Sequence, residues 1–223
     1  MAGMTEDRAK AALIITHNRP GLLADCIRAI RPQVDNVLVI DNASDPRAHV
    51  PPEVWLEYIP DQPPHLARFW NRGFEFFDKI YGDRPYDVAV LCDDAIVPEG
   101  WFEAVAAGMR DTGAAVGCSN PWGMEHPPVL KTEPDRNIMS RMIGWAFVLD
   151  ATKGLRANEN MQWWWFDTDL DWQGRLSGGF VMVGGYPVPN VHPGQYTNER
   201  PSLGEQAGRD RSAFAARWGW VPW

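Results

Sequence analysis

The chain has 223 residues, of which 45% are hydrophobic and 22% are charged, a composition typical of a globular protein with one sizeable core. The formal net charge of -8 argues against a broad surface for nucleic acids or anionic membranes. No apolar run is long enough to cross a membrane, and the first one is followed directly by polar residues, unlike a signal peptide.

The first apolar run, at residues 11–16, predicts a buried strand. Apolar residues at helical spacing follow in 22–31, where Pro20 suits the first turn and Pro32 ends the helix. A second apolar strand is expected at residues 36–40, before a segment rich in turn-forming residues. The order strand, helix, strand predicts a right-handed crossover and a parallel pair.

The alternation continues through the first half of the chain. A strand is expected at residues 54–59, a helix at 66–80, a strand at 87–92, a helix at 99–110 and a strand at 114–118. The apolar stripe of the helix at 66–80 comprises Leu66, Phe69, Trp70, Gly73, Phe74, Phe77 and Ile80. This alternation predicts an α/β domain with a mostly parallel sheet and helices on both faces.

The pattern is less regular after residue 118. Residues 119–142 carry four prolines and predict a long loop, a kind of segment that is usually functional or mobile. A strand is expected at residues 143–149, a helix at 167–179, a strand at 180–189 and a final helix at 208–219. Since no repeat or linker interrupts the chain, we expect a single domain.

Three cysteines, Cys26, Cys92 and Cys118, lie in apolar contexts without C-x-x-C spacing. Such cysteines are typical of buried free thiols in a reducing compartment. We therefore expect a cytoplasmic protein.

Polar residues follow the predicted strands at the points where the strands end. In an open parallel sheet, ligands bind beyond the carboxyl ends of the strands, so we expect these residues to meet at one edge. They are Thr16, His17, Asn18 and Arg19 after the first strand, Asp41 and Asn42 after the second, and Asp93 and Asp94 after the fourth.

The adjacent acids Asp93 and Asp94 repel each other, and neither is cheap to bury unless a cation or hydrogen-bond donors compensate. One reading is an N-cap of the following helix, for which Asp is an ordinary residue. The other is a site for Mg²⁺ or Mn²⁺, since both ions prefer hard oxygen ligands. This stretch alone leaves both readings open.

An acid after the second strand, here Asp41, often holds a ribose hydroxyl in such folds. The first turn reads THNRPG, however, and contains neither the G-x-G-x-x-G pattern nor a P-loop. A bound nucleotide would therefore need its diphosphate neutralised in another way, for instance by a divalent cation on Asp93 or Asp94.

The chain contains 12 tryptophans, three of them consecutive at residues 163–165. Successive side chains point in different directions in a strand or a helix, so these three cannot all face one core. At least one is expected to line a surface or cleft, where its flat ring would suit a sugar. Packing is the alternative for each of them.

Seven segments resemble, in order, the family 2 glycosyltransferases of the GT-A fold, and the resemblance covers nearly the whole chain. The segments are ALIITHNRPGLLADCIRAI, NVLVIDNAS, NRG, LCDDAIVPEGW, WFDTDLDWQGRLSGG, VHPGQ and FAARWG. The resemblance implies one Rossmann-like GT-A domain over residues 1–223. Residues 1–118 would bind the nucleotide sugar, and residues 119–223 would bind the acceptor and carry out catalysis.

The resemblance also implies where the donor lies. Thr16 and Asn18 resemble the first-strand loop that touches the nucleotide, and Asp41 resembles the acid that reads its base or ribose. The segment at residues 71–73 matches an Asn-x-Gly element near the nucleotide sugar. The expected donor-binding residues are Thr16, His17, Asn18, Arg19, Asp41, Asn42, Asn71 and Asp93.

Asp93 and Asp94 match the metal-binding acidic motif of the family, in which Cys92 stands where Asp or Asn is usual. Successive residues leaving a strand point apart, so Asp94 is the expected ligand of Mn²⁺ or Mg²⁺, and Asp93 is expected to turn toward the ribose or donor sugar. His192 resembles a late histidine that completes the site, although a lone histidine is more often structural.

The segment WFDTDL resembles the Glu-Asp-x-Asp element that supplies the general base, which makes Asp167 the expected catalytic residue. Phe166 stands where Glu is usual, which removes a like charge but also desolvates the carboxylate, with opposing effects on its pKa. The implied reaction is an inverting transfer from a nucleotide sugar, with a UDP-sugar as the expected donor. Trp145, Trp164 and Trp165 are expected to contact the acceptor.

The acceptor itself stays open between a glycan, a lipid-linked precursor, a protein and a modified nucleobase, and no oligomeric state is indicated. One rival function is a sugar-phosphate nucleotidyltransferase, although that class needs a glycine-rich first loop with a basic residue. The other rival is a carbohydrate- or nucleotide-binding module without turnover, suggested by the tryptophan content and by Cys92 and Phe166.

Overall fold

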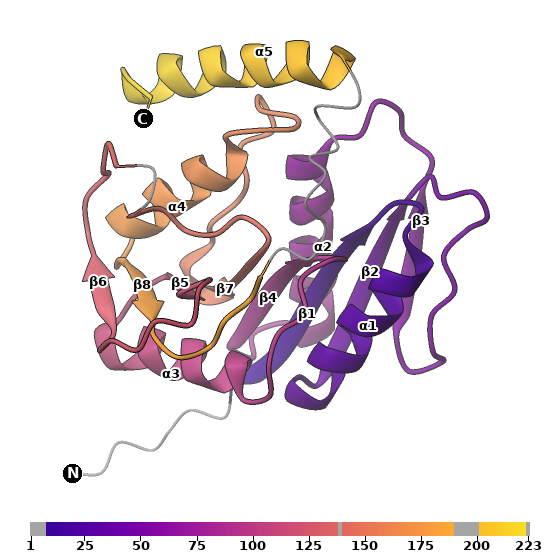
Figure 1. Ribbon diagram of the computed structural model, residues 1–223, viewed down its shortest axis with the longest axis horizontal. Coiled ribbons are helices and arrows are strands. Elements are labelled where there is room, and N and C mark those ends of the chain that lie inside the picture. Colours follow the sequence, from indigo (N-terminus) through magenta and orange to yellow (C-terminus); the bar gives the residue numbers. More distant parts are fainter. Residues whose placement is uncertain (1–7, 138–139, 190–200, 222–223) are drawn as a thin grey trace.

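The computed structural model describes residues 8–137, 140–189 and 201–221 (Figure 1). The first half of the chain forms β1 (Ala9–Thr16), α1 (Pro20–Ile30), β2 (Asn36–Asn42), β3 (Trp55–Ile59), α2 (Leu66–Tyr81), β4 (Tyr86–Cys92), α3 (Trp101–Thr112) and β5 (Val116–Ser119). The second half forms β6 (Val129–Lys131), β7 (Ala146–Asp150), α4 (Phe166–Leu176), β8 (Phe180–Val183) and α5 (Pro201–Trp218).

In the described residues, eight strands form one sheet in the order β3-β2-β1-β4-β7-β5-β8-β6. Strands β1 to β4 are mutually parallel, whereas β7 runs antiparallel between β4 and β5, and β6 runs antiparallel at the far edge. The expected α/β fold with a mostly parallel sheet is confirmed.

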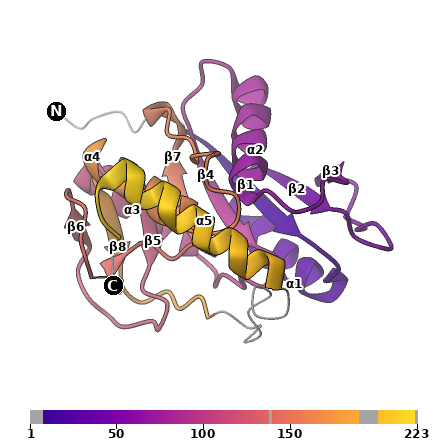
Figure 2. The same cartoon turned by 90° about the horizontal axis from the view of Figure 1, so that it is seen from above.

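Helices cover both faces of this sheet. Figure 2 shows α1 and α2 on opposite sides of β1, β2 and β3. Helix α3 lies on the face of α1, because Gln33, just after α1, accepts a hydrogen bond from the backbone N–H of Phe102 and donates to Pro98 O. Helix α5 lies across one end of the molecule beside α4 (Figure 1).

The register of the parallel strands brings their carboxyl ends together. Thr16 at the end of β1 pairs with Asp41 of β2, and Ile15 pairs with Cys92 of β4 on the other side. Residues 11–14 of β1 are fully buried because strands flank β1 on both edges and helices cover it. The apolar centre of the sheet therefore fixes where the polar strand ends lie.

The second half differs from the sequence expectation in several boundaries. Residues 119–142 are not all loop, because they contain the edge strand β6, which is too short to give a periodic signal. Strand β8 ends at Val183, since the chain turns at Gly184 and Gly185, where Gly185 N–H bonds to Met124 O. Helix α5 begins at Pro201 and β7 at Ala146.

The buried face of α2 also ends earlier than predicted. Ile80 is 45% exposed, whereas Phe77, one turn earlier, is fully buried. The helical spacing of apolar residues thus continues to Ile80, although the last turn of α2 no longer packs against the core.

The three cysteines are free. Cys26 and Cys118 are buried as expected, whereas Cys92 is only partly buried. Burial raises the pKa of the Cys118 thiol to about 12. Within the described ranges, no helix has the length and apolar character that a bilayer span requires.

We predict that Gly73→Ala destabilises the fold by about 1–3 kcal/mol, because overpacking a full core is costly. A Cβ at Gly73 would lie 2.4 Å from Cδ2 of the buried Leu13, in the contact between α2 and β1. The control is Gly21→Ala in α1, where a Cβ meets nothing within 4 Å. Urea unfolding should show a lower midpoint for Gly73→Ala alone, and equal midpoints would contradict this packing.

Candidate active site

The carboxyl ends of β1 and β4 meet through charged and hydroxyl side chains. Thr16 Oγ1 donates a hydrogen bond to Asp93 Oδ2 at 2.8 Å. Arg19 Nη1 lies 3.3 Å from Asp93 Oδ1 and 3.1 Å from Asp94 Oδ2. The two acids are only 4% and 6% exposed, so two buried carboxylates share one guanidinium.

The N-cap reading of these acids is wrong. Helix α3 begins only at Trp101, with Gly100 at its N-cap and no side-chain cap. Asp93 and Asp94 instead occupy a turn that the bond from Ala95 N–H to Cys92 O closes directly after β4. The pair is therefore held at the edge of the sheet by its own turn.

The acid pair is not electrically balanced by its described neighbours. Burial raises the pKa of the Asp93 carboxyl, against the hydrogen bond from Thr16 and the charge of Arg19, while the charge of Asp94 adds to the rise. Two carboxylates facing one guanidinium leave a surplus of negative charge when both are ionised. A further cation would stabilise this arrangement.

The carboxylate of Asp41 is fully buried and holds the loop after β2. Its two oxygens accept hydrogen bonds from the backbone N–H groups of Ser44 (3.1 Å) and Ala48 (2.7 Å). Asn42 Nδ2 donates to Ile59 O and Asp61 O, which ties the end of β2 to the segment after β3. Both residues shape the wall of the site beside β1.

The turn after β1 is attached to the same loop. His17 Nδ1 lies 2.5 Å from Asn42 O. Asn18, at φ 56°, donates from its backbone N–H to Ser44 Oγ and accepts at Oδ1 from Asp45 N–H. The expected donor-side residues at the ends of β1 and β2 thus lie together.

Asn71, the expected donor-binding residue of α2, hydrogen-bonds to the segment before α4. Its buried side chain donates to Ala157 O and Glu159 Oε1, and it accepts from Ala157 N–H. These contacts attach α2 to the segment that precedes α4. In the structure Asn71 anchors this segment with its whole amide group.

Asp167 lies half-buried in the first turn of α4. Its Oδ1 accepts a hydrogen bond from Thr168 N–H at 2.7 Å. Its Oδ2 lies against Gly144, where an added Cβ would be only 2.4 Å away. The next residue, Trp145, accepts at its carbonyl from Cys92 N–H at 3.0 Å. A short path of contacts therefore joins Asp167 to the end of β4.

The residues around Asp167 have structural partners. Phe166 is buried against Trp70, with ring centroids 4.5 Å apart, so the position where the family usually has Glu belongs here to the core. Asp169 is fully buried and accepts from Trp218 Nε1 (2.8 Å) and Arg217 Nη1 (3.0 Å) of α5.

The tryptophan run is held by a buried carboxylate of α5. Asp210 accepts hydrogen bonds from the consecutive backbone N–H groups of residues 162–164 at 2.7–3.0 Å. Trp165 adopts φ 67° and packs on Phe214, with ring centroids 5.3 Å apart. Trp163, Trp164 and Trp165 are all half-buried, which agrees with the expectation that the run does not lie wholly in the core.

Trp145, whose carbonyl accepts from Cys92 at the end of β4, is partly exposed and donates from Nε1 to Val188 O. His192 lies outside the described residues. Within the part of the chain that the structure describes, no group of three or more His, Cys, Asp or Glu side chains could hold a metal ion.

Asp94 nevertheless fits a simpler type of metal site. Mg²⁺ is commonly bound by one or two carboxylates together with the phosphates of its substrate, and Mn²⁺ also accepts hard oxygen ligands. The surplus negative charge of the acid pair favours such an ion. A preformed cage of protein ligands is not needed for it.

Sequence reasoning missed Gly144 and Asp210. Gly144 gave no signal, because a glycine near a strand is common and its closeness to Asp167 arises only in the fold. Asp210 lies between arginines in a segment that reads as a solvated helix face, so nothing indicated its burial.

No protein-family profile and no curated protein sequence matches this chain. Solved structures do match. S. aureus TarS 1-349 in complex with UDP-GlcNAc aligns over 93% of this chain and 71% of its own, with a TM-score of 0.62 and 8% identity. S. aureus TarS in another crystal structure aligns over 94% of this chain and 43% of its own, with a TM-score of 0.58 and 11% identity.

A third match is glucosyl-3-phosphoglycerate synthase from Mycobacterium tuberculosis in complex with Mn²⁺, UDP-glucose and phosphoglyceric acid. It aligns over 97% of this chain and 81% of its own, with a TM-score of 0.62 and 12% identity. These proteins are glycosyltransferases of the GT-A fold, so the expected fold is confirmed.

We predict that Asp210→Ala destabilises the protein, because an unpaired buried N–H group costs about 1–3 kcal/mol. Amide exchange at residues 162–164 should accelerate, since these N–H groups lose their acceptor. The matched control is Arg211→Ala, a change at the neighbouring exposed position of α5. Similar stability and exchange in the two variants would show that Asp210 does not hold the tryptophan run.

Proposed function

We propose that this protein transfers a sugar from a UDP-sugar to a hydroxyl group of an acceptor, with inversion at the anomeric carbon. The observation that carries the proposal is the path of contacts from the acid pair at the end of β4, through Cys92, Trp145 and Gly144, to Asp167. This path connects the acid pair, whose negative charge favours a bound cation, to Asp167, a carboxylate that could accept a proton.

The donor is proposed to lie against the ends of β1, β2 and β4, within the half formed by residues 1–118. The loops after β1 and β2 are joined through His17, Asn18 and Asn42, so they form one wall. Ligands of open α/β sheets occupy this edge. Two of the structural matches are complexes with UDP-GlcNAc and UDP-glucose, which supports uracil as the base.

Asp94, with His192 as a further ligand, is proposed to hold Mn²⁺ or Mg²⁺. The mycobacterial match is a complex with Mn²⁺, which supports a divalent ion. When bound, such an ion offsets the negative charge of the diphosphate leaving group. Asp93, fixed by Thr16 Oγ1, is proposed to contact the ribose or donor sugar.

Asp167 is proposed as the general base. Its Oδ1 is occupied by Thr168 N–H, whereas among the described residues no hydrogen bond reaches Oδ2. Oδ2 is therefore the oxygen available to take the proton of an acceptor hydroxyl as that hydroxyl attacks the anomeric carbon. Attack from the side opposite the diphosphate gives inversion.

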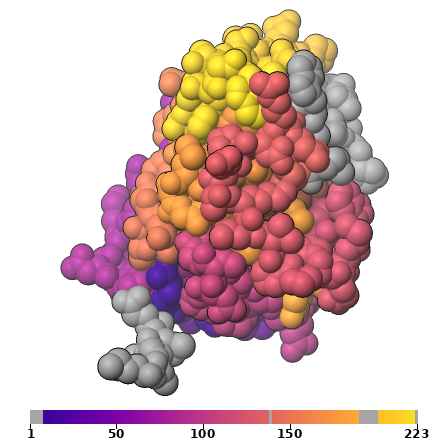
Figure 3. All heavy atoms as spheres, turned by 90° about the vertical axis from the view of Figure 1, so that its left-hand side faces the viewer, coloured from indigo at the N-terminus to yellow at the C-terminus, as the bar shows by residue number. Residues whose placement is uncertain are grey.

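The acceptor is proposed to approach over residues 119–223. Three partly exposed tryptophans are candidates for a platform under a sugar ring or another flat group. Trp164 and Trp165 precede Asp167 closely in the chain, and Trp145 follows Gly144, which lies against Asp167. Figure 3 shows the face that residues 119–137 help to cover beneath α5.

We predict that Asp167→Asn retains UDP binding but reduces turnover by roughly 10²- to 10⁴-fold, the usual contribution of a positioned base. The measurement is UDP release from UDP-glucose and UDP-GlcNAc, with and without acceptor, alongside calorimetric titration of UDP. Wild-type rates in Asp167→Asn would remove Asp167 from the mechanism. A wild-type protein that binds UDP but never releases it from a UDP-sugar would favour a binding module.

We predict that Gly144→Ala reduces turnover by about tenfold or more, since a displaced catalytic group loses its alignment. The added methyl group would clash with Asp167 Oδ2. Gly204→Ala is the control, because a Cβ there meets nothing within 4 Å. UDP affinity should stay unchanged in both variants, and an unchanged turnover in Gly144→Ala would contradict the role of this contact.

A further inference from the structure

Besides Arg19, which contacts the acid pair, a second cationic side chain, Arg141, lies close to Asp167. Arg141 Nη1 is 3.4 Å from Thr168 Oγ1, and this hydroxyl is itself 3.4 Å from Asp167 Oδ1. The side chain of Arg141 belongs to a half-buried residue in the segment before β7. A guanidinium is therefore placed one side chain away from the proposed base.

Arg141 differs from the other arginines of this region in having no acid. Arg19 contacts Asp93 and Asp94, Arg175 pairs with Asp171, and Arg217 pairs with Asp169. Among the described residues, Arg141 makes one hydrogen bond, to the Thr168 hydroxyl, and no ion pair. Its charge is thus left for a ligand.

The backbone on both sides of Arg141 is fixed. Ser140 O accepts hydrogen bonds from Lys131 Nζ (3.0 Å) and Arg175 Nη2 (2.8 Å). Met142 N–H donates to Asp171 Oδ2 at 3.3 Å. The position of Arg141 is therefore set before any ligand arrives.

The anchor of this segment is a buried ion pair of α4. Arg175 Nε and Nη2 lie 2.9 Å from the two oxygens of Asp171, and both side chains are at most 1% exposed. Asp171 follows Asp167 by four residues, so the two lie on the same side of α4. The helix that carries the proposed base also fixes the segment that carries Arg141.

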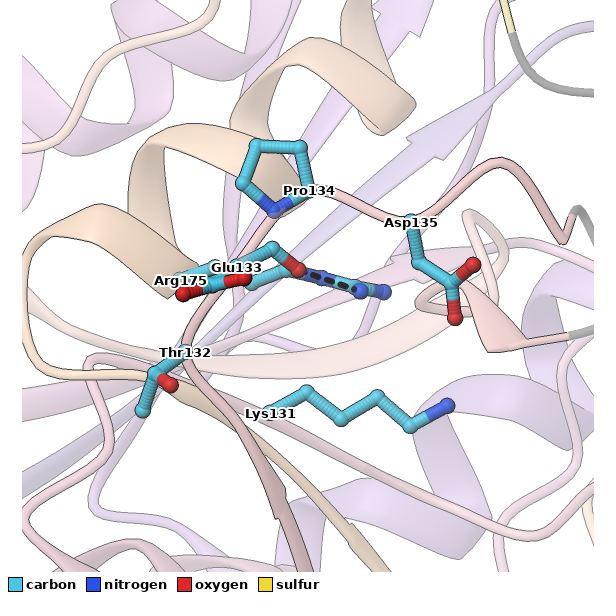
Figure 4. Close-up of a pocket in the computed structure, with 6 residues that line it drawn as sticks. All are labelled: Lys131, Thr132, Glu133, Pro134, Asp135 and Arg175. Carbon is cyan, nitrogen blue, oxygen red and sulfur yellow. Dashed lines mark hydrogen bonds between the residues drawn. The ribbon is translucent and has the colours of Figure 1, made fainter.

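Two further cationic side chains, Lys131 and Arg175, line a neighbouring cavity, but both already donate hydrogen bonds within the protein. Lys131, Asp135 and Arg175 are among the residues that line this cavity of about 350 Å³. Figure 4 shows their side chains. Arg175 Nη1 donates to Glu133 O, and both Lys131 Nζ and Arg175 Nη2 donate to Ser140 O. Burial, together with the charge of Arg175, lowers the pKa of Lys131. Lys131 and Arg175 therefore hold the segment before β7 in place. Arg141 is the cation that lies next to Thr168 and Asp167.

We propose that Arg141 binds an anionic group of the acceptor, a phosphate or carboxylate close to the hydroxyl that Asp167 deprotonates. The inference rests on the proposed function and adds the chemical class of its acceptor. The planar guanidinium matches both anions through two parallel N–H bonds.

The test is a calorimetric titration of inorganic phosphate into the protein with saturating UDP and Mg²⁺, so that the diphosphate site is filled. The wild type should bind phosphate saturably, and Arg141→Ala should weaken this binding by about tenfold or more, since charged hydrogen bonds of this kind are lost. Arg136→Ala, at an exposed position of the same segment, is the control and should bind phosphate as the wild type does.

Equal phosphate affinity in Arg141→Ala and the wild type, or no saturable binding by the wild type, would overturn the inference. A weaker UDP affinity in Arg141→Ala would also overturn it, because Arg141 would then belong to the donor site. If UDP does not bind at all, the proposed function fails, and the same comparison without UDP still decides the role of Arg141.

Two further ligands identify the source of the anion. Glycerol 3-phosphate tests a soluble phosphate ester, and vesicles of phosphatidylglycerol and phosphatidylcholine test the same chemistry in a lipid headgroup. Binding of either that depends on Arg141 supports the inference and names the source. Binding of both that is unchanged in Arg141→Ala would contradict it.

Discussion

Two buried carboxylates at the end of β4 share a single guanidinium, and the candidate site is arranged around this imbalance of charge. The register between β1 and β4 creates it, because it places Thr16 and Arg19 beside Asp93 and Asp94. Buried charges are tolerated only with compensating partners. The described residues supply one cation for two acids, so the arrangement favours the binding of a divalent cation, which could in turn hold a diphosphate.

Three aspartates of helix α4 have three different structural roles on the other side of the site. Asp167 is half-buried and keeps one oxygen without a hydrogen bond among the described residues. Asp169 faces α5 and holds Arg217 and Trp218. Asp171 pairs with Arg175 and fixes the segment before β7. Helical spacing turns Asp169 toward α5, whereas Asp167 and Asp171, four residues apart, share the other side of α4.

The order of strands and helices could be predicted, because apolar periodicity is a local property of the sequence. Asp93 and Asp94 could be selected as candidates because they follow a predicted strand of the sheet, whereas Asp167 was selected only from the resemblance of its segment to a family motif. The partners could not. Arg141, Gly144 and Asp210 acquire their surroundings only when segments distant in the chain pack together, and their local sequences resemble ordinary loops and solvated helices. Strand β6 was missed for the same reason, because it forms only against β8.

The proposed site depends most directly on a divalent cation that allows the acid pair to hold the nucleotide. Calorimetric titration of UDP into the wild-type protein, with Mn²⁺ or with EDTA, tests this dependence without assuming any acceptor. We expect UDP to bind about tenfold or more weakly in EDTA, because the diphosphate then meets the negative surplus of Asp93 and Asp94 unscreened. Equal UDP affinity in Mn²⁺ and in EDTA would contradict this role of the acid pair.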